Sequence, residues 1–448
     1  MMTVRVRFAP SPTGYLHVGN IRVALVNYLL AGGQPSSFVL RFDDTDRERS
    51  KDEYVQGILR DLRWLGIGWQ EEYYQSQRLE RYAAAADTLK AAGRLYPCYE
   101  TPEELEYMRR RQRARGKPPV YDRSALELTD SQRADYEAQG RRPHWRFKML
   151  PGTIEWNDLT RGTCTYDAAH LADPVLIRED GTFLYMMPSV VDDAEMAITH
   201  VVRGEDHVTN TAVQIQIFKA LGYQPPLFAH LPLLVDADGN GLSKRLGSMS
   251  MGDLREQGLE PMAISSLLGH LGSSDAIEPF DSLQALGSSF DVSHFGRSTP
   301  RFDPAELLRL NQKLIHALPW DQAEPRLQAL GLDKADAAFW EVVRSNLTVL
   351  CDAAIWHAVV HDALPLQDFS DDDRAFLAQA AALLPTAPWD GQTWKAWTTA
   401  VKDATGRKGK TLFMPLRQAL TGHDHGPEMS GLLPLLGHDL VLTRLTAG

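Results

Sequence analysis

The stretch RFAPSPTGYLHVGN, residues 7–20, limits the possible folds of this chain more than any other segment. It follows VRV, an alternating run typical of a strand, and leads into IRVALVNYLLA, an apolar run typical of a helix. Two prolines restrict the backbone between them, and a glycine allows conformations closed to other residues. The sequence therefore predicts a strand and a helix joined by a rigid turn that presents His17 and Gly19.

Strands and helices alternate in the segments that follow. SFVLRF predicts a strand, KDEYVQGILRDLRWLG from Lys51 a helix, and residues 79–92 an alanine-rich helix. MAITHVVRGEDH from Met196, TAVQIQIFKALG and PLFAHLPLLV predict a second strand–helix–strand unit. This order is typical of a doubly wound parallel sheet. Residues 96–187, with a basic helix and short strands, indicate an insertion, and the chain after about Pro300 is mostly helical.

Several polar segments are placed where such a sheet would bind a ligand, beyond the carboxyl ends of its strands. A helix N-terminus suits phosphate, His17 adds a donor for charge that develops on phosphorus, and Gly19 allows close approach. LRFDDTDRERS and VVRGEDH follow strands, and GLSKRLGS carries Lys and Arg on a loop that could close over phosphates. Each segment alone is as readily an ordinary turn or solvated loop, and only their combination indicates a site.

The charge distribution restricts the partners of the chain. The net charge of −11 argues against a non-specific nucleic-acid coat. Three basic runs, at residues 109–117, 140–148 and 406–410, nevertheless favour an anionic polymer as a local partner. No signal-peptide core and no apolar run of about 18 residues is present, so no membrane partner is expected. Three widely spaced cysteines argue against a disulfide framework and fit a reduced cytosol.

Taken together, the motifs resemble one family. RFAPSPTGYLHVGN resembles the first signature of the class I aminoacyl-tRNA synthetases, and LSKR resembles the second. RFAPSPTG, RFDDTDRERS, VVDDAEMAITHVVRGEDH and GRKGKTLFMPLRQALTG, in this order, resemble the glutamyl-tRNA synthetase (glutamate–tRNA ligase) family nearly end to end. The resemblance implies an enzyme that makes glutamyl-adenylate from L-glutamate and ATP with Mg²⁺, releasing diphosphate. It then transfers glutamate to the 3′ end of tRNA(Glu) and releases AMP. In the family the first step also needs bound tRNA, and a cytoplasmic monomer is usual.

The fold that the resemblance implies is α/β. It is a class I Rossmann-like parallel-sheet catalytic domain with an inserted acceptor-stem domain and an all-α C-terminal anticodon-binding region. The expected segments are residues 1–95 and 191–235 for the two catalytic halves, 96–190 for the insertion, 236–320 for a connecting region with the LSKR loop, and 321–448 for the anticodon-binding domain.

The resemblance also implies roles for residues at matching positions. The expected ATP-binding residues are His17, Gly19, Asn20, Asp206, His207, Ser243, Lys244 and Arg245, of which His17 and Lys244 would be catalytic. The expected glutamate-binding residues are Arg7, Ser11, Asp43, Tyr185 and Arg203, and the expected tRNA-binding residues are Arg407, Lys408 and Lys410. Arginine suits a carboxylate because its planar fork can bind both oxygens, so the site should reject glutamine.

Three positions depart from the family pattern, and the zinc-binding cysteines of some members are missing. Asp43 stands where glutamate is usual, and Asn20 stands at the second histidine of the class signature. Gly241 replaces a lysine of the second signature, so one phosphate-facing charge is missing. Some members hold zinc with cysteines of the insertion, but here only Cys98 remains, so no structural zinc and no other metal site is expected.

Several functions remain open on the sequence alone. The chain could charge tRNA(Glu) only, or it could also charge tRNA(Gln) without discriminating. A tRNA-modifying paralogue lacks the anticodon part, so the helical segment after Pro300 argues against it. A catalytically weakened tRNA-binding paralogue is suggested only by Gly241, and the retained His17 and Lys244 argue against it.

Overall fold

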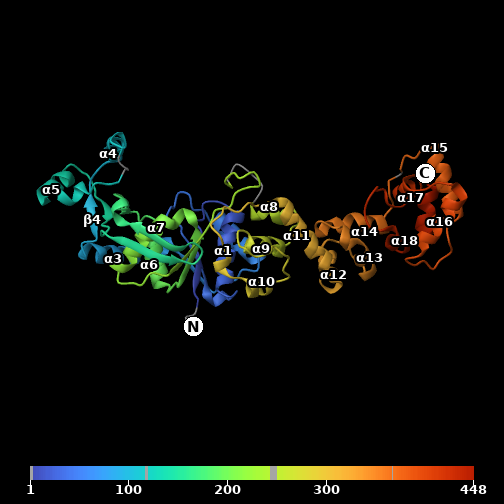
Figure 1. Ribbon diagram of the computed structural model, residues 1–448, viewed down its shortest axis with the longest axis horizontal. Helices are drawn as coiled ribbons and strands as arrows, with labels where there is room; N and C mark the ends of the chain where they lie inside the picture. Colours follow the sequence, from blue (N-terminus) through green and yellow to red (C-terminus); the bar gives the residue numbers. More distant parts are fainter. Residues whose placement is uncertain (1–3, 117–119, 243–249, 366, 448) are drawn as a thin grey trace. The chain divides into compact units, whose positions relative to one another are not determined.

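The computed structural model describes residues 4–116, 120–242, 250–365 and 367–447, so Ser243, Lys244 and Arg245 lie outside the described residues. The chain divides into two compact units (Figure 1). The first comprises Met1–Leu254 with Ile264–Asp303, and the second comprises Arg255–Ala263 with Pro304–Gly448. The finer division into five segments stays a prediction.

Parallel strands form the centre of the first unit. One sheet has the order β1 (Val6–Phe8), β2 (Phe38–Phe42), β3 (Glu71–Tyr74), all parallel. A second has the order β7 (Gly162–Asp167), β6 (Thr153–Asp158), β10 (Leu227–Leu231), β9 (His200–Gly204), in which β6, β10 and β9 are parallel. β1 lies beside β9, because the Thr199 N–H donates to the Arg5 carbonyl (2.9 Å) and the Arg7 side chain reaches the Val202 carbonyl (3.4 Å). The order of the strands thus reverses between β1 and β9, which is where open α/β sheets bind ligands.

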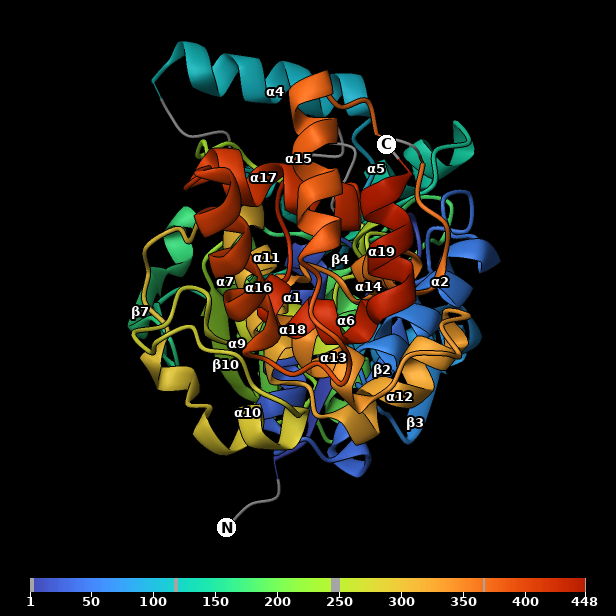
Figure 2. The same cartoon turned by 90° about the vertical axis from the view of Figure 1, so that its right-hand side faces the viewer.

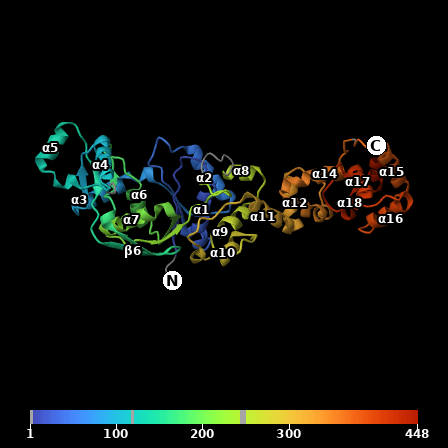
Figure 3. The ribbon, with the colours of Figure 1, turned by 45° about the horizontal axis from the view of Figure 1, so that its top comes forward.

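Helices pack on these strands, and all but the one at Met186–Glu195 lie where the apolar periodicity predicts a helix. They are α1 (Val18–Leu30), α2 (Asp52–Trp64), α3 (Leu79–Ala91), α6 (Met186–Glu195) and α7 (Val208–Ala220). Figure 3 shows α6 and α7 side by side next to β6. Tyr82, Met187 and Phe218, one from each of three of these helices, are buried in one apolar cluster. The predicted α/β alternation is confirmed.

The inserted segment forms a third, antiparallel sheet. Its strands are β4 (Leu95–Cys98), β5 (His144–Phe147) and β8 (Val175–Ile177), accompanied by α4 (Pro102–Ala114) and α5 (Asp130–Ala138). One part of the segment behaves differently: the hairpin of β6 and β7 joins the parallel sheet, because Asp158 of β6 pairs with Phe228 of β10. Asp158 and the residues near it therefore lie beside β10 of the parallel sheet.

The second unit is helical. After α8 (Met251–Glu256), α9 (Pro261–His270) and α10 (Leu283–Ser289), the chain forms α11 (Pro304–Ala317), α12 (Trp320–Ala329), α13 (Ala337–Val343), α14 (Ala353–His361), α15 (Asp371–Ala382), α16 (Thr393–Thr405), α17 (Lys410–Thr421), α18 (Met429–Leu436) and α19 (His438–Thr446). α15, α17 and α19 pack against one another (Figure 2), and Trp340 and Trp397 are buried in the core of this unit. Among the described residues, no helix is long and apolar enough to cross a membrane.

Candidate active site

A cavity of about 810 Å³ opens where β1 and β9 end. It brings together every predicted glutamate- or ATP-binding residue that the structure describes. These residues are Arg7, Ser11, His17, Gly19, Asn20, Asp43, Tyr185, Arg203, Asp206 and His207. Gly241 and Leu242, which directly precede the undescribed Ser243, also line it. Arg22 and Arg41 are lining residues that sequence reasoning missed.

The N-terminus of α1 forms one wall of the cavity. His17 caps this helix, because its Nδ1 accepts the Gly19 N–H (3.1 Å) while its own N–H donates to Asn20 Oδ1 (3.2 Å). With Nδ1 accepting, the neutral imidazole carries its proton on Nε2 and keeps a donor there. Ser250 forms a bridge with His17, so the chain returns to this turn just after the second signature.

Two buried arginines that line the cavity share one carboxylate. Asp193 of α6 accepts from Arg41 Nη1 (2.7 Å) and from Arg7 Nε (3.1 Å). Arg41 Nε also donates to Asp43 Oδ1 (2.7 Å). Burial by itself would raise the pKa of Asp193, but Arg7 and Arg41 lower it below its usual range. These guanidinium groups are therefore fixed in position and largely compensated in charge.

A second carboxylate of α6, that of Asp192, lies 3.8 Å from Arg41 Nε. Asp192 accepts from Arg78 Nε (2.7 Å), the Tyr82 hydroxyl (2.8 Å) and Gln75 Nε2 (3.0 Å). Sequence reasoning assigned no role to the adjacent Asp192 and Asp193. The signal that could have found them is a pair of acids in an otherwise apolar helix, since buried carboxylates require partners.

Asp43 differs electrostatically from Asp193. Burial raises the pKa of its carboxyl to about 6, although Arg41 opposes the shift. Above that pH the side chain presents a negative charge at the rim of the cavity. Such a charge can attract an ammonium group.

The surroundings of Arg203 differ from those of Arg7 and Arg41. Arg203 Nη2 donates to Thr211 Oγ1 (2.6 Å) and Gln214 Oε1 (2.7 Å), and its Nη1 donates to the Tyr185 hydroxyl (3.1 Å). These acceptors are neutral, and within the described residues no carboxylate forms an ion pair with it. Burial lowers the pKa of Arg203, yet an arginine remains protonated. The cavity thus contains a buried positive charge that no carboxylate of the described residues pairs with directly.

Asp206 and His207 directly follow the end of β9 and line the same cavity. Asp206 Oδ2 lies 3.5 Å from His207 Nε2, and the ring of His207 lies 5.4 Å from that of Tyr185. Burial lowers the pKa of His207, with Asp206 opposing the shift. A neutral His207 offers a flat polar surface beside the pocket.

The predicted tRNA-binding residues lie in the second unit and differ from one another. Arg407 forms ion pairs with Asp372 and with Asp373 (2.6 Å for the latter), and its guanidinium stacks over the ring of Phe376. Lys408 and Lys410 are exposed. The two lysines are therefore the available charges of this run, whereas Arg407 is already used within the unit.

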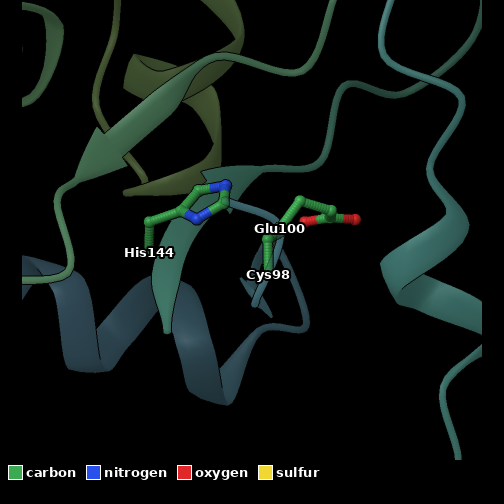
Figure 4. Close-up of side chains that lie close together, drawn as sticks. All are labelled: Cys98, Glu100 and His144. Atoms are coloured by element: carbon green, nitrogen blue, oxygen red, sulfur yellow. The ribbon is translucent and has the colours of Figure 1, made fainter. Parts of the chain in front are cut away.

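Cys98, Glu100 and His144 come together in the inserted segment (Figure 4), with their ligand atoms within 4.8 Å of one another. Tyr121 closes the group by donating to Glu100 Oε1 (2.6 Å), and Arg146 stacks on its ring (4.1 Å). Burial raises the pKa of the Cys98 thiol to about 12. A structural zinc site normally has four Cys or His ligands, and here a hydrogen-bonded tyrosine and a cation adjoin only two. The donor set does not fit such a site, and the absence of zinc stays a prediction.

Comparison with known proteins identifies the family. Residues 3–308 match the tRNA synthetases class I (E and Q), catalytic domain, and residues 347–448 match an anticodon binding domain. The chain belongs to the class I tRNA synthetases of this glutamate and glutamine group.

Within that group its relatives carry one activity in their names. It is 55% identical over 442 residues to Glutamate–tRNA ligase 1 of Maricaulis maris, covering 98% of both chains. It is 58% identical to Glutamate–tRNA ligase 2 of Methylobacterium sp., again covering 98% of both. A crystal structure of a glutamate tRNA ligase from Elizabethkingia meningosepticum, in complex with its amino acid, superimposes with a TM-score of 0.86 at 26% identity over 99% of both chains.

Proposed function

We propose that this chain is a glutamate–tRNA ligase. The α-carboxylate of L-glutamate attacks the α-phosphate of ATP, forming glutamyl-adenylate and releasing diphosphate. A hydroxyl of the terminal adenosine of tRNA then attacks the acyl carbonyl, and AMP leaves. Relatives of this name that match nearly the whole chain support the assignment.

The observation that carries the proposal is the uncompensated charge of Arg203. A buried cation without a counter-ion is unfavourable unless a ligand supplies one. Arg203 faces the cavity beside the Tyr185 hydroxyl, and Asp43 lies in the same cavity as a partner for an ammonium group. An amino acid with a carboxylate side chain fits this combination. Glutamine cannot neutralise the arginine, so the site selects against it.

The N-terminus of α1 suits the phosphates of ATP. Its first N–H groups and the partial positive charge of the helix favour an anion, and His17 adds its Nε2–H. Mg²⁺ enters with ATP as part of the substrate. Lys244 of the second signature would follow the departing diphosphate.

Transfer RNA is the second substrate. The match of residues 347–448 to an anticodon binding domain supports recognition of tRNA by the helical unit. The names of the relatives give glutamate and tRNA as the substrates, and we take tRNA(Glu) as the tRNA that is charged. Whether tRNA(Gln) is also charged is tested directly by aminoacylation of both purified tRNAs.

The central test is glutamate-dependent exchange between ATP and diphosphate in the presence of tRNA. The wild-type chain should catalyse it with glutamate and not with glutamine. Arg203→Ala should raise the KM for glutamate by about 10- to 100-fold, the loss of roughly 1.5–3 kcal/mol expected for a hydrogen bond to a charged group. Its KM for ATP is the internal control, and equal losses for both substrates would contradict the assignment of Arg203.

A further inference from the structure

The orientation of Arg203 depends on residues that do not line the cavity. Besides its hydrogen bonds to Thr211 and Gln214, Arg203 Nε donates to His230 Nε2 at 3.3 Å. The Thr211 hydroxyl lies 2.8 Å from the same nitrogen. His230 Nε2 must therefore act as an acceptor, since a guanidinium can only donate.

His230 is held in this role by a buried carboxylate. Its Nδ1 lies 2.5 Å from Asp158 Oδ2, and its backbone N–H donates to Asp158 Oδ1 (3.1 Å). Neither side chain is exposed to solvent. Burial would raise the pKa of Asp158, but the hydrogen bonds from His230 hold it at about 2. Burial lowers the pKa of His230.

These two states fix one tautomer. A carboxylate can only accept, so Nδ1 of the neutral ring must carry the proton. The lone pair then lies on Nε2, where it faces Arg203. With the opposite tautomer an N–H would face the N–H of Arg203.

The strands bring the three residues together. In the parallel pairing of β9 and β10, Arg203 lies opposite His230, and Asp158 ends β6 on the other side of β10. The chain Asp158–His230–Arg203 thus crosses three neighbouring strands and ends in the cavity.

We propose that Asp158 and His230 are positioning residues for the carboxylate of the substrate: the aspartate selects the tautomer in which the histidine accepts from Arg203 and aims its guanidinium at the ligand. The inference rests on the proposed function. The group that contacts Arg203 is the neutral ring of His230. The ring therefore orients the guanidinium without compensating its charge. Asp193 does the opposite for Arg7 and Arg41, which it contacts directly. A directly paired Arg203 would bind glutamate less selectively.

Two substitutions at His230 separate its hydrogen bond to Asp158 from its hydrogen bond with Arg203. The side-chain amide of glutamine reaches the place of Nε2, so His230→Gln keeps an acceptor for Arg203. The shorter amide of asparagine reaches the place of Nδ1, so His230→Asn keeps the bond to Asp158 and loses the acceptor. We expect His230→Asn to raise the KM for glutamate about 10-fold or more and to reduce the preference for glutamate over glutamine. His230→Gln should keep the KM for glutamate and the preference for glutamate near their wild-type values. Neither variant should change the KM for ATP.

Asp158→Asn tests the selection of the tautomer. An amide can donate as well as accept, so it permits the proton to move to Nε2. The KM for glutamate should rise in this variant. In the His230→Gln background the same change should have no further effect, because glutamine has no tautomer to select.

The outcomes distinguish the two proposals. Absence of glutamate-dependent exchange in the wild type would overturn the proposed function, and this inference with it. An active wild type with the same glutamate KM in His230→Asn would overturn only the positioning role. Equal losses in His230→Asn and His230→Gln, with a matching loss for ATP, would make His230 merely structural. Melting temperatures identify variants that do not fold. If a His230 variant does not fold, the KM values of Asp158→Asn for glutamate and for ATP provide the test instead.

Discussion

At the scale of single residues, the cavity separates two kinds of buried arginine. Arg7 and Arg41 share the carboxylate of Asp193, whereas Arg203 is held by neutral acceptors only. The first arrangement gives rigidity, and the second leaves a charge for the ligand. The acceptors that surround an arginine therefore determine how much of its charge remains for a ligand.

Gln214→Glu should convert Arg203 from the second kind to the first. Gln214 Oε1 already lies 2.7 Å from Arg203 Nη2, so a carboxylate there would form an ion pair with little movement. We expect the KM for glutamate to rise about 10-fold while the KM for ATP stays constant. Gln216→Glu is the matched control, because Gln216 lies on the same helix, contacts Arg94 and does not line the cavity. An unchanged glutamate KM in Gln214→Glu would refute the role of the free charge.

The raised pKa of Asp43 predicts a pH dependence. Its value of about 6 means that the carboxyl is protonated below that pH and no longer attracts an ammonium group. The kcat/KM for glutamate should fall as the pH drops through about 6, and this inflection should vanish in Asp43→Asn. Because the folded chain binds this proton more tightly than the unfolded one, the contribution of Asp43 to stability decreases as the pH rises from about 4 to about 6. Thermal unfolding of both proteins across this range tests the second effect.

At the scale of elements, the start of α1 joins a helix end to His17, the side chain proposed to act on the phosphates. The Gly19 N–H holds His17 Nδ1, and a Cβ at position 19 would lie 2.9 Å from His17 Cε1. Helix propensity alone favours alanine over glycine by up to about 1 kcal/mol. The absence of a Cβ at Gly19 therefore leaves the space that the His17 ring occupies.

Gly19→Ala should displace His17 with little net change in stability, because the gain in helix propensity offsets the loss of the N-cap. Loss of one preorganised donor lowers the rate of adenylate formation by up to about 10²–10³. Stopped-flow or exchange measurements give that rate, and calorimetry should show a nearly unchanged Tm. Gly287→Ala in α10 is the control, since the nearest atom to its Cβ is an ordinary 3.7 Å away. A Gly19→Ala variant with the wild-type rate would exclude a role for the ring position.

The altered second signature can be tested at Gly241. A Cβ at this position would meet no atom of the described residues within 4 Å, and the residue lines the cavity. We expect Gly241→Lys to restore a phosphate-facing charge and lower the KM for ATP, whereas the same charge one residue earlier, in Asn240→Lys, should not. Lys244→Ala should slow activation by about 10²–10³. It should barely affect transfer from preformed glutamyl-adenylate, because no diphosphate leaves in that step. Equal slowing of both steps would contradict the assignment.

At the scale of the whole molecule, the proposed division between chemistry and anticodon recognition follows the two units. The cavity belongs to the first unit, and the anticodon-binding match belongs to the second. Within the second unit the basic run is divided again. Arg407 is paired with Asp372 and Asp373, whereas Lys408 and Lys410 are exposed.

Replacing Lys408 and Lys410 together with alanine should weaken tRNA binding. It should also flatten the salt dependence of binding by up to about 0.9 in slope for each lysine–phosphate interaction that is removed. The melting temperature should not change. Arg407→Ala should lower the melting temperature, because it leaves two carboxylates without their partner. Binding isotherms at several salt concentrations measure the slopes, and an unchanged slope in the double variant would show that the lysines are only solvated.

The local sequence determined much of this protein. Alternating apolar residues and the proline-rich turn at residues 7–20 predict β1, α1 and the ligand-binding edge, because strand and helix periodicities depend on near neighbours. The same holds for the placement of Arg203 at the end of β9. The family motifs located the cavity residues, since each motif is a short contiguous segment.

Only the tertiary structure decided which charges are compensated. Asp193 reaches Arg7 and Arg41, and Asp158 reaches His230, across long stretches of chain. These pairings depend on strand order and register, including the return of β6 to the parallel sheet, and no local pattern encodes them. A carboxylate or arginine looks the same in the sequence whether it is paired or free. Its charge becomes available to a ligand only through the neighbours that folding places around it.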